Sequence, residues 1–447
     1  MAYMPQAVLL MKGKCKNLED QRKRKIDYKW VIAVLGFMMV FTCLGFCSSP
    51  KSLFVSAITE ALDIKRSLYS VNDTCRYVAN AVISIFFGFL VSKFGTKKLI
   101  CAGFVSLIAS SLLYSVATEL WMFYLGGTFL GIGLSWTTTT MVSCIINRWH
   151  KENTGTVLGA VLAANGVGGT VATQILSPII YQEGNPFGFR QAYLLVAAVL
   201  AVLGILIMIF YRETPKGEDK NAPVQKHKKK KRGGQWFGIP FAELVHMPYF
   251  YASIACITIM GMAVGGVNGI YVVHLKDVGF DPSFVAIVMS AHTLLLTVYK
   301  LLTGILYDKC GLRTTVNICS VSGVVLMLIL FSITLSPTGK FLALIYGVFS
   351  SVAQPIETVM LPIMSGDMFG QHSFEKILGI VTSFHVAGAA ISSPMVNLVF
   401  DLTGSYRPAI LVCAALLAIA AVIMQFLMTY AGKRRKLVEQ SELATQE

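Results

Sequence analysis

Long apolar runs, bounded by short polar segments, follow one another along almost the whole chain. A helix needs about 20 apolar residues to cross the hydrocarbon core of a bilayer, and twelve runs reach that length. They cover approximately residues 30–50, 69–92, 99–117, 120–145, 155–181, 190–211, 249–274, 283–306, 315–335, 341–364, 376–400 and 408–430. The pattern predicts an all-α membrane protein with twelve transmembrane helices.

The composition agrees with this prediction. The 447-residue chain is 55% hydrophobic, has a mean hydropathy of +0.65 and contains only 14% charged residues, whereas an ordinary soluble domain has roughly 25%. Motifs of the His-Glu-x-x-His and Gly-x-Ser-x-Gly types are absent from the sequence. The ten cysteines are scattered without a Cys-x-x-Cys pair, so we expect them to be free. We expect neither an enzyme nor a site for a metal or cofactor.

A short basic signature occurs twice, each time at the end of an apolar run. Residues 88–98 read GFLVSKFGTKK, and residues 304–314 read GILYDKCGLRT, 216 positions later. The chain is therefore a tandem repeat, and we predict two pseudo-symmetric six-helix bundles at 30–211 and 249–430. Duplicated bundles of this kind hold a substrate at the interface between the halves, as in secondary transporters.

A shift of 220 residues aligns a second, glycine-rich stretch in the fifth and eleventh predicted helices. Gly159 falls on Gly379, and Gly168 falls on Gly388. Small residues at this density let helix backbones approach closely. The contact could serve a gate in which these helices slide against their neighbours, or it could be tight packing without a moving part.

The formal net charge of +15 raises the question of a nucleic-acid partner. Most of the 38 lysines and arginines fall in a tail at 1–29, a linker at 212–248, a tail at 431–447 and the loops on the same side. This positive-inside asymmetry predicts that both termini are cytoplasmic. The run at 226–232 indicates a linker that touches anionic lipid. No folded module with interleaved aromatics accompanies it, so we expect no nucleic acid.

Few ionisable residues fall inside the predicted helices, where each costs roughly 2.5–3.5 kcal/mol on insertion scales. They are Asp73, Arg76, His292, Lys300, Glu357 and His385, with Lys51 near the outer end of the first helix. Because burial of a charge is costly, each of these residues needs a structural or functional reason.

Lys300 lies four residues before Gly304, one turn into the membrane. A lone cation there fits a site for an anionic substrate, and Tyr299 and His292, seven residues apart, would add donors on a neighbouring face. Two other readings remain open. The long stem could extend to the interface, or the ammonium group could pair with Glu357.

Asp73 and Arg76 are three residues apart and can pair on one helical face. Arg76 could instead be a second contact for an anion or an outer gate. Glu357 has no basic neighbour in sequence, and a buried carboxyl group can carry a proton; it could also be a satisfied polar contact. His385 occupies the repeat position of Asn165, so the two could face each other across a central cavity, or His385 could be a hydrogen-bonded core residue.

The repeated loop between the second and third helices of each half resembles the signature of the major facilitator superfamily, and the resemblance covers essentially the whole chain. In that family the loop latches one closed state of the carrier. The resemblance implies a latch made of Gly88, Lys93, Gly95, Lys97, Asp308, Lys309 and Arg313. Ser92 stands where the first copy usually has an aspartate.

Further motifs are similar to the monocarboxylate transporter branch and its microbial oxalate/formate relatives. The first helix closes with Pro50-Lys51-Ser52, and the resemblance implies that Lys51 contacts the substrate carboxylate. Lys300 matches the family's cation four residues before a glycine, which pairs with the anion. Animal members carry an aspartate four residues before that cation, where this chain has Leu296.

Two more features bear on the substrate. Arg148-Trp149 resembles the bacterial version of the loop into the fifth helix. The oxalate/formate carrier uses an eleventh-helix lysine for a second carboxylate, and the nearest candidate here is His385. A monocarboxylate is therefore favoured over a dicarboxylate.

Together these observations predict a carrier of small monocarboxylates, such as lactate, pyruvate or formate, in a bacterial plasma membrane. Its partners would be the carboxylate, H⁺ and membrane lipids, with the single chain as the functional unit. The anion would be bound by Lys51, Lys300, Tyr299, His385, Asn165 and Arg76, and the proton by Glu357 or His385. Alternatives are an anion exchanger without proton coupling and, from another class, a nutrient sensor that does not transport.

Overall fold

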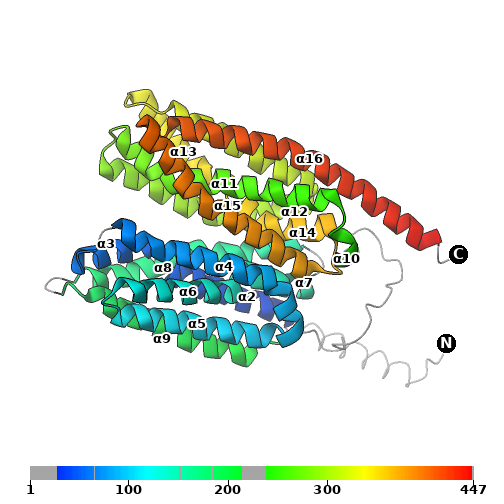
Figure 1. Cartoon of the computed structure of the whole chain (residues 1–447), viewed down its shortest axis with the longest axis horizontal. Helices are drawn as coiled ribbons and strands as arrows, with labels where there is room; N and C mark the ends of the chain where they lie inside the picture. The colour runs from blue at the N-terminus through cyan, green and yellow to red at the C-terminus, as the bar shows by residue number, and fades with distance from the viewer. Residues whose placement is uncertain (1–27, 65, 151–152, 183–184, 214–237, 445–447) are drawn as a thin grey trace, which may run out of the picture.

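A computed structural model describes residues 28–64, 66–150, 153–182, 185–213 and 238–444. All regular structure in these ranges is helical, and the helices form two bundles that lie side by side (Figure 1). The first bundle contains α2 (Tyr28–Cys47), α3 (Lys51–Ala61), α4 (Arg66–Phe94), α5 (Thr96–Val116), α6 (Leu120–Thr137), α7 (Thr139–Trp149), α8 (Thr154–Ile180) and α9 (Gly188–Phe210). The second contains α10 (Phe241–Leu244), α11 (Pro248–Asp277), α12 (Pro282–Ser332), α13 (Pro337–Phe349), the 3₁₀ turn η1 (Ser350–Val352), the π-helix η2 (Ile356–Met360), α14 (Leu361–Phe369), α15 (Phe374–Thr403) and α16 (Arg407–Ala444).

The twelve predicted spans are recovered, although two of them are joined in α12. Eleven helical segments of the described chain are long and apolar enough to cross a membrane, and one of them runs over 46 residues from Ile287 to Ser332. At 1.5 Å per residue this segment is about 69 Å long, more than twice the thickness of the hydrocarbon core. Gly311, at φ 80° and ψ 173°, breaks it into two spans. Gly95, the equivalent residue of the first repeat, has φ 78° and separates α4 from α5.

The bundles meet along two helix pairs, α8 with α12 and α4 with α15. A β-carbon at Gly159 would lie 2.5 Å from the carbonyl oxygen of Lys300, and one at Gly379 would lie 2.9 Å from Cβ of Phe87. These two repeat-related glycines therefore lie at the contact between the halves. Gly168 and Gly388 approach the backbones of Phe41 and Thr258 within their own halves. The predicted close approach of backbones is confirmed at all four glycines.

One span in each bundle is broken near its middle. The fourth span bends at Thr138, whose φ of −119° and ψ of −145° end α6 and precede α7. The tenth span passes through η1 and η2 between α13 and α14. Thr358, in η2, is the repeat equivalent of Thr138. Interrupted spans at equivalent positions of two halves are a feature of transporter binding sites, because the break frees backbone groups near the bilayer midplane.

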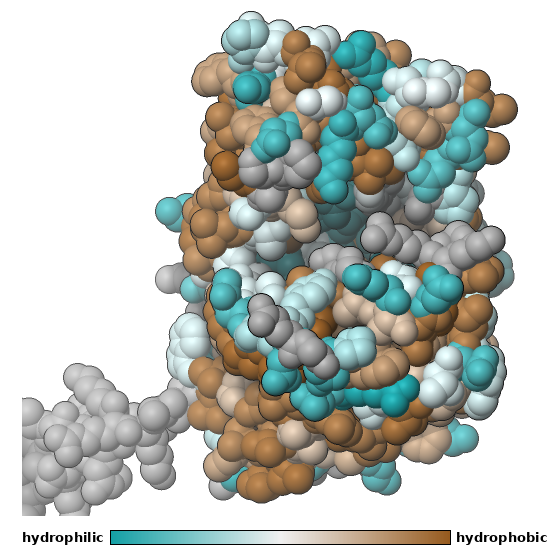
Figure 2. All heavy atoms as spheres, turned by 90° about the vertical axis from the view of Figure 1, so that its left-hand side faces the viewer, coloured by the Kyte–Doolittle hydropathy of each residue, from teal (hydrophilic) through white to brown (hydrophobic). Residues whose placement is uncertain are grey.

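The two ends of the molecule differ. We call the end where α9 stops at Phe210 and α10 starts at Phe241 the linker end, and the opposite end, near α3, the open end (Figure 1). Figure 2 looks onto the open end and shows the surface hollowed between the two bundles, with hydrophilic residues in the hollow. At the linker end the bundles are joined by hydrogen bonds and an ion pair.

Several predicted segments extend beyond the described residues. Of the predicted tail at 1–29 only the last two residues are described, and the basic run at 226–232 lies outside the described ranges. In the predicted tail at 431–447, α16 continues as helix to Ala444. The nine cysteines of the described chain are free, as expected.

Candidate functional site

A cluster of charged side chains lies at the open end of the first bundle. Lys51, at the start of α3, forms an ion pair with Asp73 of α4, and Arg76 NH2 lies 3.5 Å from the same carboxylate. Arg76 also donates to Ser48 Oγ at 3.2 Å and lies 4.6 Å above the ring of Tyr77. The predicted contact between Asp73 and Arg76 is therefore present, and Lys51 joins it. Two cations share one carboxylate, so the cluster keeps a net positive charge.

Accessibility divides this cluster into two parts. The side chain of Lys51 is 45% exposed, whereas that of Arg76 is 10% exposed. Arg76 is thus fixed among protein groups, and Lys51 is the cation that a solute entering from the open end can reach.

Lys300 lies in the eighth span, four residues before Gly304, where α12 meets α8 of the other bundle. It is only 4% exposed, and its backbone carbonyl packs against Gly159. Within the described residues no hydrogen bond or ion pair involves its ammonium group, so the proposed pair with Glu357 is not formed. The neighbouring Tyr299 is partly buried. An unpaired cation at this depth is costly, and the arrangement suits an anionic ligand.

Glu357 lies in η2, which packs against α12 and α8. Its Oε1 atom and the hydroxyl of Thr358 are buried without a hydrogen-bond partner among the described residues. A charged carboxylate that is buried without a partner is strongly disfavoured. The π-helix therefore carries an acidic group suited to holding a proton.

His385 and Asn165 occupy equivalent positions but have different surroundings. Asn165 Oδ1 accepts a hydrogen bond from Ser49 Oγ at 3.2 Å. The ring of His385 packs against α11, where a β-carbon at Gly261 would lie 2.5 Å from its Nδ1. No interaction in the described part of the chain joins the two residues. Asn165 lies beside the short connection between α2 and α3, near Lys51. His385 lies at the contact between α11 and α15.

At the linker end, the second copy of the repeated loop joins the two bundles directly. The Asp308 carboxylate accepts hydrogen bonds from the backbone amides of Gly155, at 3.1 Å, and Thr156, at 2.6 Å. These amides are in the first turn of α8, where free N–H groups and the helix dipole favour an anion. Arg313 donates to Thr429 of α16 within its own bundle.

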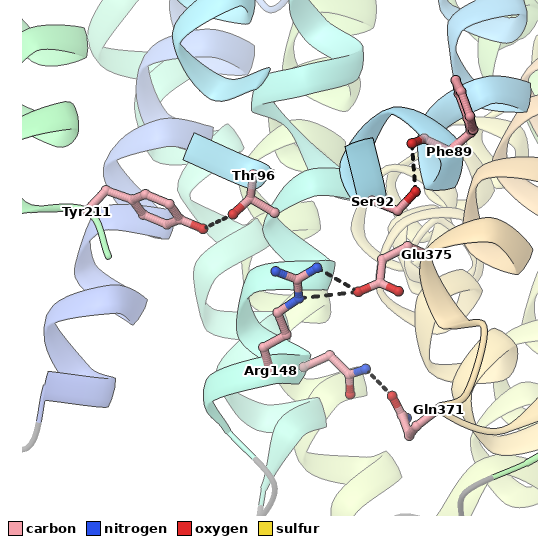
Figure 3. Close-up of polar contacts among 8 residues, drawn as sticks. Phe89, Ser92, Thr96, Arg148, Tyr211, Gln371 and Glu375 are labelled. Carbon is pink, nitrogen blue, oxygen red and sulfur yellow. Dashed lines mark hydrogen bonds and ion pairs between the residues drawn. The ribbon is translucent and has the colours of Figure 1, made fainter. Parts of the chain in front are cut away.

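The first copy joins the bundles differently, as Figure 3 shows. Ser92 donates to Phe89 O of its own helix at 2.8 Å. The contact between the bundles is made by Arg148 of α7, whose Nε and NH2 lie 3.2 and 2.8 Å from Glu375 Oε1 in α15, and by a hydrogen bond from Asn147 to Gln371.

The other described contacts of the first copy of the loop are made to residues of the first bundle. The backbone amide of Lys97 donates to Glu213 at 2.9 Å, and Lys93 lies over the rings of Phe89 and Phe94. Tyr211, just after α9, hydrogen bonds to Thr96 at 2.8 Å (Figure 3). Burial raises the pKa of the Tyr211 phenol to about 12, so its hydroxyl stays neutral. These contacts anchor the start of α5 to the end of α9.

The backbones of the first loop and the opposite bundle are nevertheless close. A β-carbon at Gly88 would lie 2.5 Å from the backbone nitrogen of Lys376. Gly88 therefore allows α4 to touch the first turn of α15.

Comparison with known proteins identifies the architecture. The Major Facilitator Superfamily model matches residues 30–271 and 254–446. The chain belongs to the major facilitator superfamily. An uncharacterized MFS-type transporter, YcxA, of Bacillus subtilis is 24% identical over 408 residues, which cover 88% of this chain and 94% of that protein. Monocarboxylate transporter 13 of Bos taurus is 28% identical over 338 residues, which cover 73% and 72% of the two chains.

Solved structures share the fold of this superfamily member. The fucose:proton symporter FucP in its outward conformation superposes with a TM-score of 0.68 at 14% identity, covering 90% of this chain and 99% of that one. The proton:xylose symporter XylE gives 0.71 at 13% identity, covering 89% and 95%. The chain is thus a multi-pass membrane carrier and not an enzyme.

Sequence reasoning missed the partners that join the halves of this carrier. Glu375 was not considered, although at the 220-residue shift it occupies the position of Gly155, directly in the first turn of an apolar helix. That shift, applied to charged residues as well as to glycines, would have identified it. The bond from Asn147 to Gln371 had no such signal, because neither residue belongs to a repeated motif.

Proposed function

We propose that this chain carries small monocarboxylates, such as lactate, pyruvate or formate, across a bacterial inner membrane by alternating access. The observation that supports this most directly is Lys300, a buried cation at the contact between the bundles to which no described anionic group is paired. A carboxylate would supply the missing counter-ion. Rocking of the halves about this point would then expose the site to each side in turn.

The relatives support the same substrate class. Monocarboxylate transporters 13 and 12 of mammals are 22–28% identical to the chain over more than two thirds of its length. The net positive charge of the cluster around Lys51 supports it as well, because an anion entering from the open end meets this cluster first. The substrate carboxylate would compete with Asp73 for Lys51 before it reaches Lys300.

The distribution of charge supports an orientation. The described basic residues of the repeated loops and of the end of α16 gather at the linker end; they include Lys93, Lys97, Lys98, Lys309, Arg313, Lys433, Arg434 and Arg435. We therefore place the linker end and both termini in the cytoplasm, with one chain as the functional unit. The open end would face outward.

Glu357 is our candidate for proton coupling, and His385 is the second. The carboxyl group of Glu357 has a buried, unpaired oxygen in a π-helix that contacts α12. Protonation would remove a charge that is costly in this position. Leu296 stands where animal monocarboxylate carriers have an acid, so a proton would not be carried at that position. Anion exchange without a proton is the alternative.

Uptake of labelled lactate, pyruvate and formate into proteoliposomes tests the proposal. Lys300→Ala should reduce uptake at least about tenfold, because the carboxylate would lose a charge-assisted contact in the membrane. Lys300→Arg should retain part of it. Lys340→Ala, at an exposed position of α13, is the matched control. Normal uptake by Lys300→Ala would show that the anion site is elsewhere.

The same assay separates the modes of transport. Stimulation by an inward proton gradient, lost in Glu357→Gln, would support symport. Stimulation by internal unlabelled substrate without an effect of the gradient would support exchange. Binding of carboxylates without uptake would support a sensor.

A further inference from the structure

The second bundle contains a small cavity, of about 20 Å³, with polar groups set among apolar walls, and neither the anion site nor the latches use it. It is enclosed by α11, α12, α13 and η1, and its walls are Val264, Val267, Asn268, His292, Gly323, Leu326, Met327, Tyr346, Ser350, Ala353 and Gln354. Asn268 is the exposed member of this set, whereas His292, Tyr346 and Ser350 are at least nine-tenths buried. The cavity wall therefore combines one exposed amide with polar groups that are buried inside the bundle.

Hydrogen bonds hold the His292 ring in the wall of this cavity. Its Nδ1 lies 2.7 Å from Ser350 Oγ and 3.1 Å from Ser351 Oγ. The Ser351 hydroxyl donates to the carbonyl oxygen of His292, at 2.6 Å. The Ser350 hydroxyl can donate to Nδ1 or accept from it, and Nε2 of the neutral ring is accordingly a donor in one tautomer and an acceptor in the other.

The rest of the lining has the same neutral character. Asn268 and Gln354 add amide donors and acceptors, Tyr346 adds a phenol, and Val264 and Met327 are among the apolar walls. Within the described part of the chain, no lysine, arginine or carboxylate lines the cavity. A neutral hydroxyl, keto or amide group fits such a site, and a second charged group does not.

The position of the cavity relative to Lys300 limits the length of a ligand. His292 and Lys300 are eight residues apart on α12, which corresponds to about 12 Å along the helix. Both side chains lean toward the N-terminus of α12 and leave the helix about 80° apart, so the longer stem of Lys300 closes only part of this gap. A ligand that reaches both points still needs several carbon atoms between its carboxylate and its neutral polar group.

We propose that this cavity is a specificity subsite for the neutral polar end of the substrate, so that the preferred cargo is a hydroxy- or oxo-carboxylate with a chain longer than that of lactate. The proposal rests on the proposed function, because it takes Lys300 as the anchor of the carboxylate. The subsite adds selection by hydrogen bonding, since a buried donor or acceptor left unpaired by the wrong substrate is costly.

Competition for uptake among three probes tests the subsite. Acetate carries only the carboxylate, hexanoate adds the chain, and 6-hydroxyhexanoate adds the terminal hydroxyl. The wild-type protein should prefer 6-hydroxyhexanoate over hexanoate by about tenfold. Asn268→Ala and Ser350→Ala should each reduce this ratio severalfold and leave acetate uptake unchanged. Ser320→Ala, a buried serine of α12 outside the cavity, should keep the ratio.

The controls separate the possible failures. Asn268 is exposed, so its substitution is compatible with folding even where Ser350→Ala lowers the melting temperature. An unchanged ratio in both variants, with all uptake lost in Lys300→Ala, would overturn the subsite and leave the proposed function intact. Normal uptake in Lys300→Ala, or no carboxylate uptake by the wild-type protein, would overturn both.

Discussion

The two copies of the repeated loop have the same backbone and different electrostatics. In each copy a glycine with φ near 80° turns the chain between two spans, Gly95 in the first and Gly311 in the second. In the second copy Asp308 accepts hydrogen bonds from the first turn of α8. In the first copy Ser92 bonds to its own helix, and the carboxylate is Glu375, in the first turn of α15 (Figure 3).

This difference decides what is lost when the bundles separate. In both copies a carboxylate lies at a helix N-terminus, where it is stabilising. Asp308 belongs to the opposite bundle, so its two bonds to α8 break on opening. Glu375 belongs to α15 itself and keeps that interaction. Only its pair with Arg148, in which both side chains are about 30% exposed, is lost. The second copy should therefore contribute more to closure of the linker end.

Substitution of the glycines at which the two bundles touch should have the largest effect on closure of the linker end. A β-carbon at Gly155 would lie 2.7 Å from the carbonyl oxygen of Gly304, and one at Gly88 would lie 2.5 Å from the nitrogen of Lys376. Overpacking of this kind typically costs about 1–3 kcal/mol. Gly155→Val and Gly88→Val should both open the linker end in spin-label distance measurements and reduce uptake about tenfold or more. Gly432→Val, with no neighbouring atom within 4 Å, should behave as wild type; a similar loss there would show a general effect on folding.

Asp308→Asn should have the next largest effect. The amide keeps the shape of the side chain but loses the charge that strengthens the bonds to Gly155 and Thr156. With about 1–2 kcal/mol lost, the ratio of closed to open linker end should fall roughly tenfold. Labelling of a single engineered cysteine at the linker end would report this shift. Asp401→Asn, an exposed residue near the other end of α15, is the control, and equal labelling of the two variants would contradict the prediction.

Glu375→Gln should shift the same equilibrium less, because an ion pair of this exposure typically contributes about 0.2–1 kcal/mol. We expect labelling to change by about 1.5- to fivefold, and this difference from the wild-type protein should become smaller at high salt. Exchange of the two charges, Arg148→Glu with Glu375→Arg, should restore the pair only in part, since it places a cation at the N-terminus of α15. A shift as large as that of Asp308→Asn would show that the two copies are equivalent in energy.

Features dictated by the membrane and by local spacing could be predicted from the sequence. Lipid leaves the backbone no partner outside a helix or barrel, so hydropathy alone identified the spans, and the spacing of Asp73 and Arg76 indicated their pair. Contacts between elements remote in sequence could not be predicted. Lys51 reaches Asp73 because α3 folds back beside α4, and Glu375 reaches Arg148 across the two bundles.

The breaks in the fourth and tenth spans differ in how far the local sequence indicates them. Thr138 is not a helix-breaking residue, so the fourth span carries no local signal. In the tenth span the helix is interrupted at Ala353 and Gln354, directly before Pro355, and a proline disfavours helix at the residue that precedes it. That proline predicts a break, which was missed.

Ser92→Asp should have the smallest effect, and it is the most direct test of the difference between the two copies of the loop. The substitution restores the usual acid of the first copy. By analogy with Asp308, which binds the first turn of α8, the new carboxylate should point to the first turn of α15, which already carries Glu375. Repulsion between the two carboxylates should offset the new bonds to α15, and we expect a change of less than about 0.5 kcal/mol in the opening equilibrium. In a Glu375→Gln background the same substitution should favour closure by up to about 1 kcal/mol, because no other carboxylate then lies at the N-terminus of α15. Cysteine labelling of the four proteins in this double-mutant cycle measures the coupling. Equal effects of Ser92→Asp in both backgrounds would mean that Glu375 has not taken over the role of the missing aspartate.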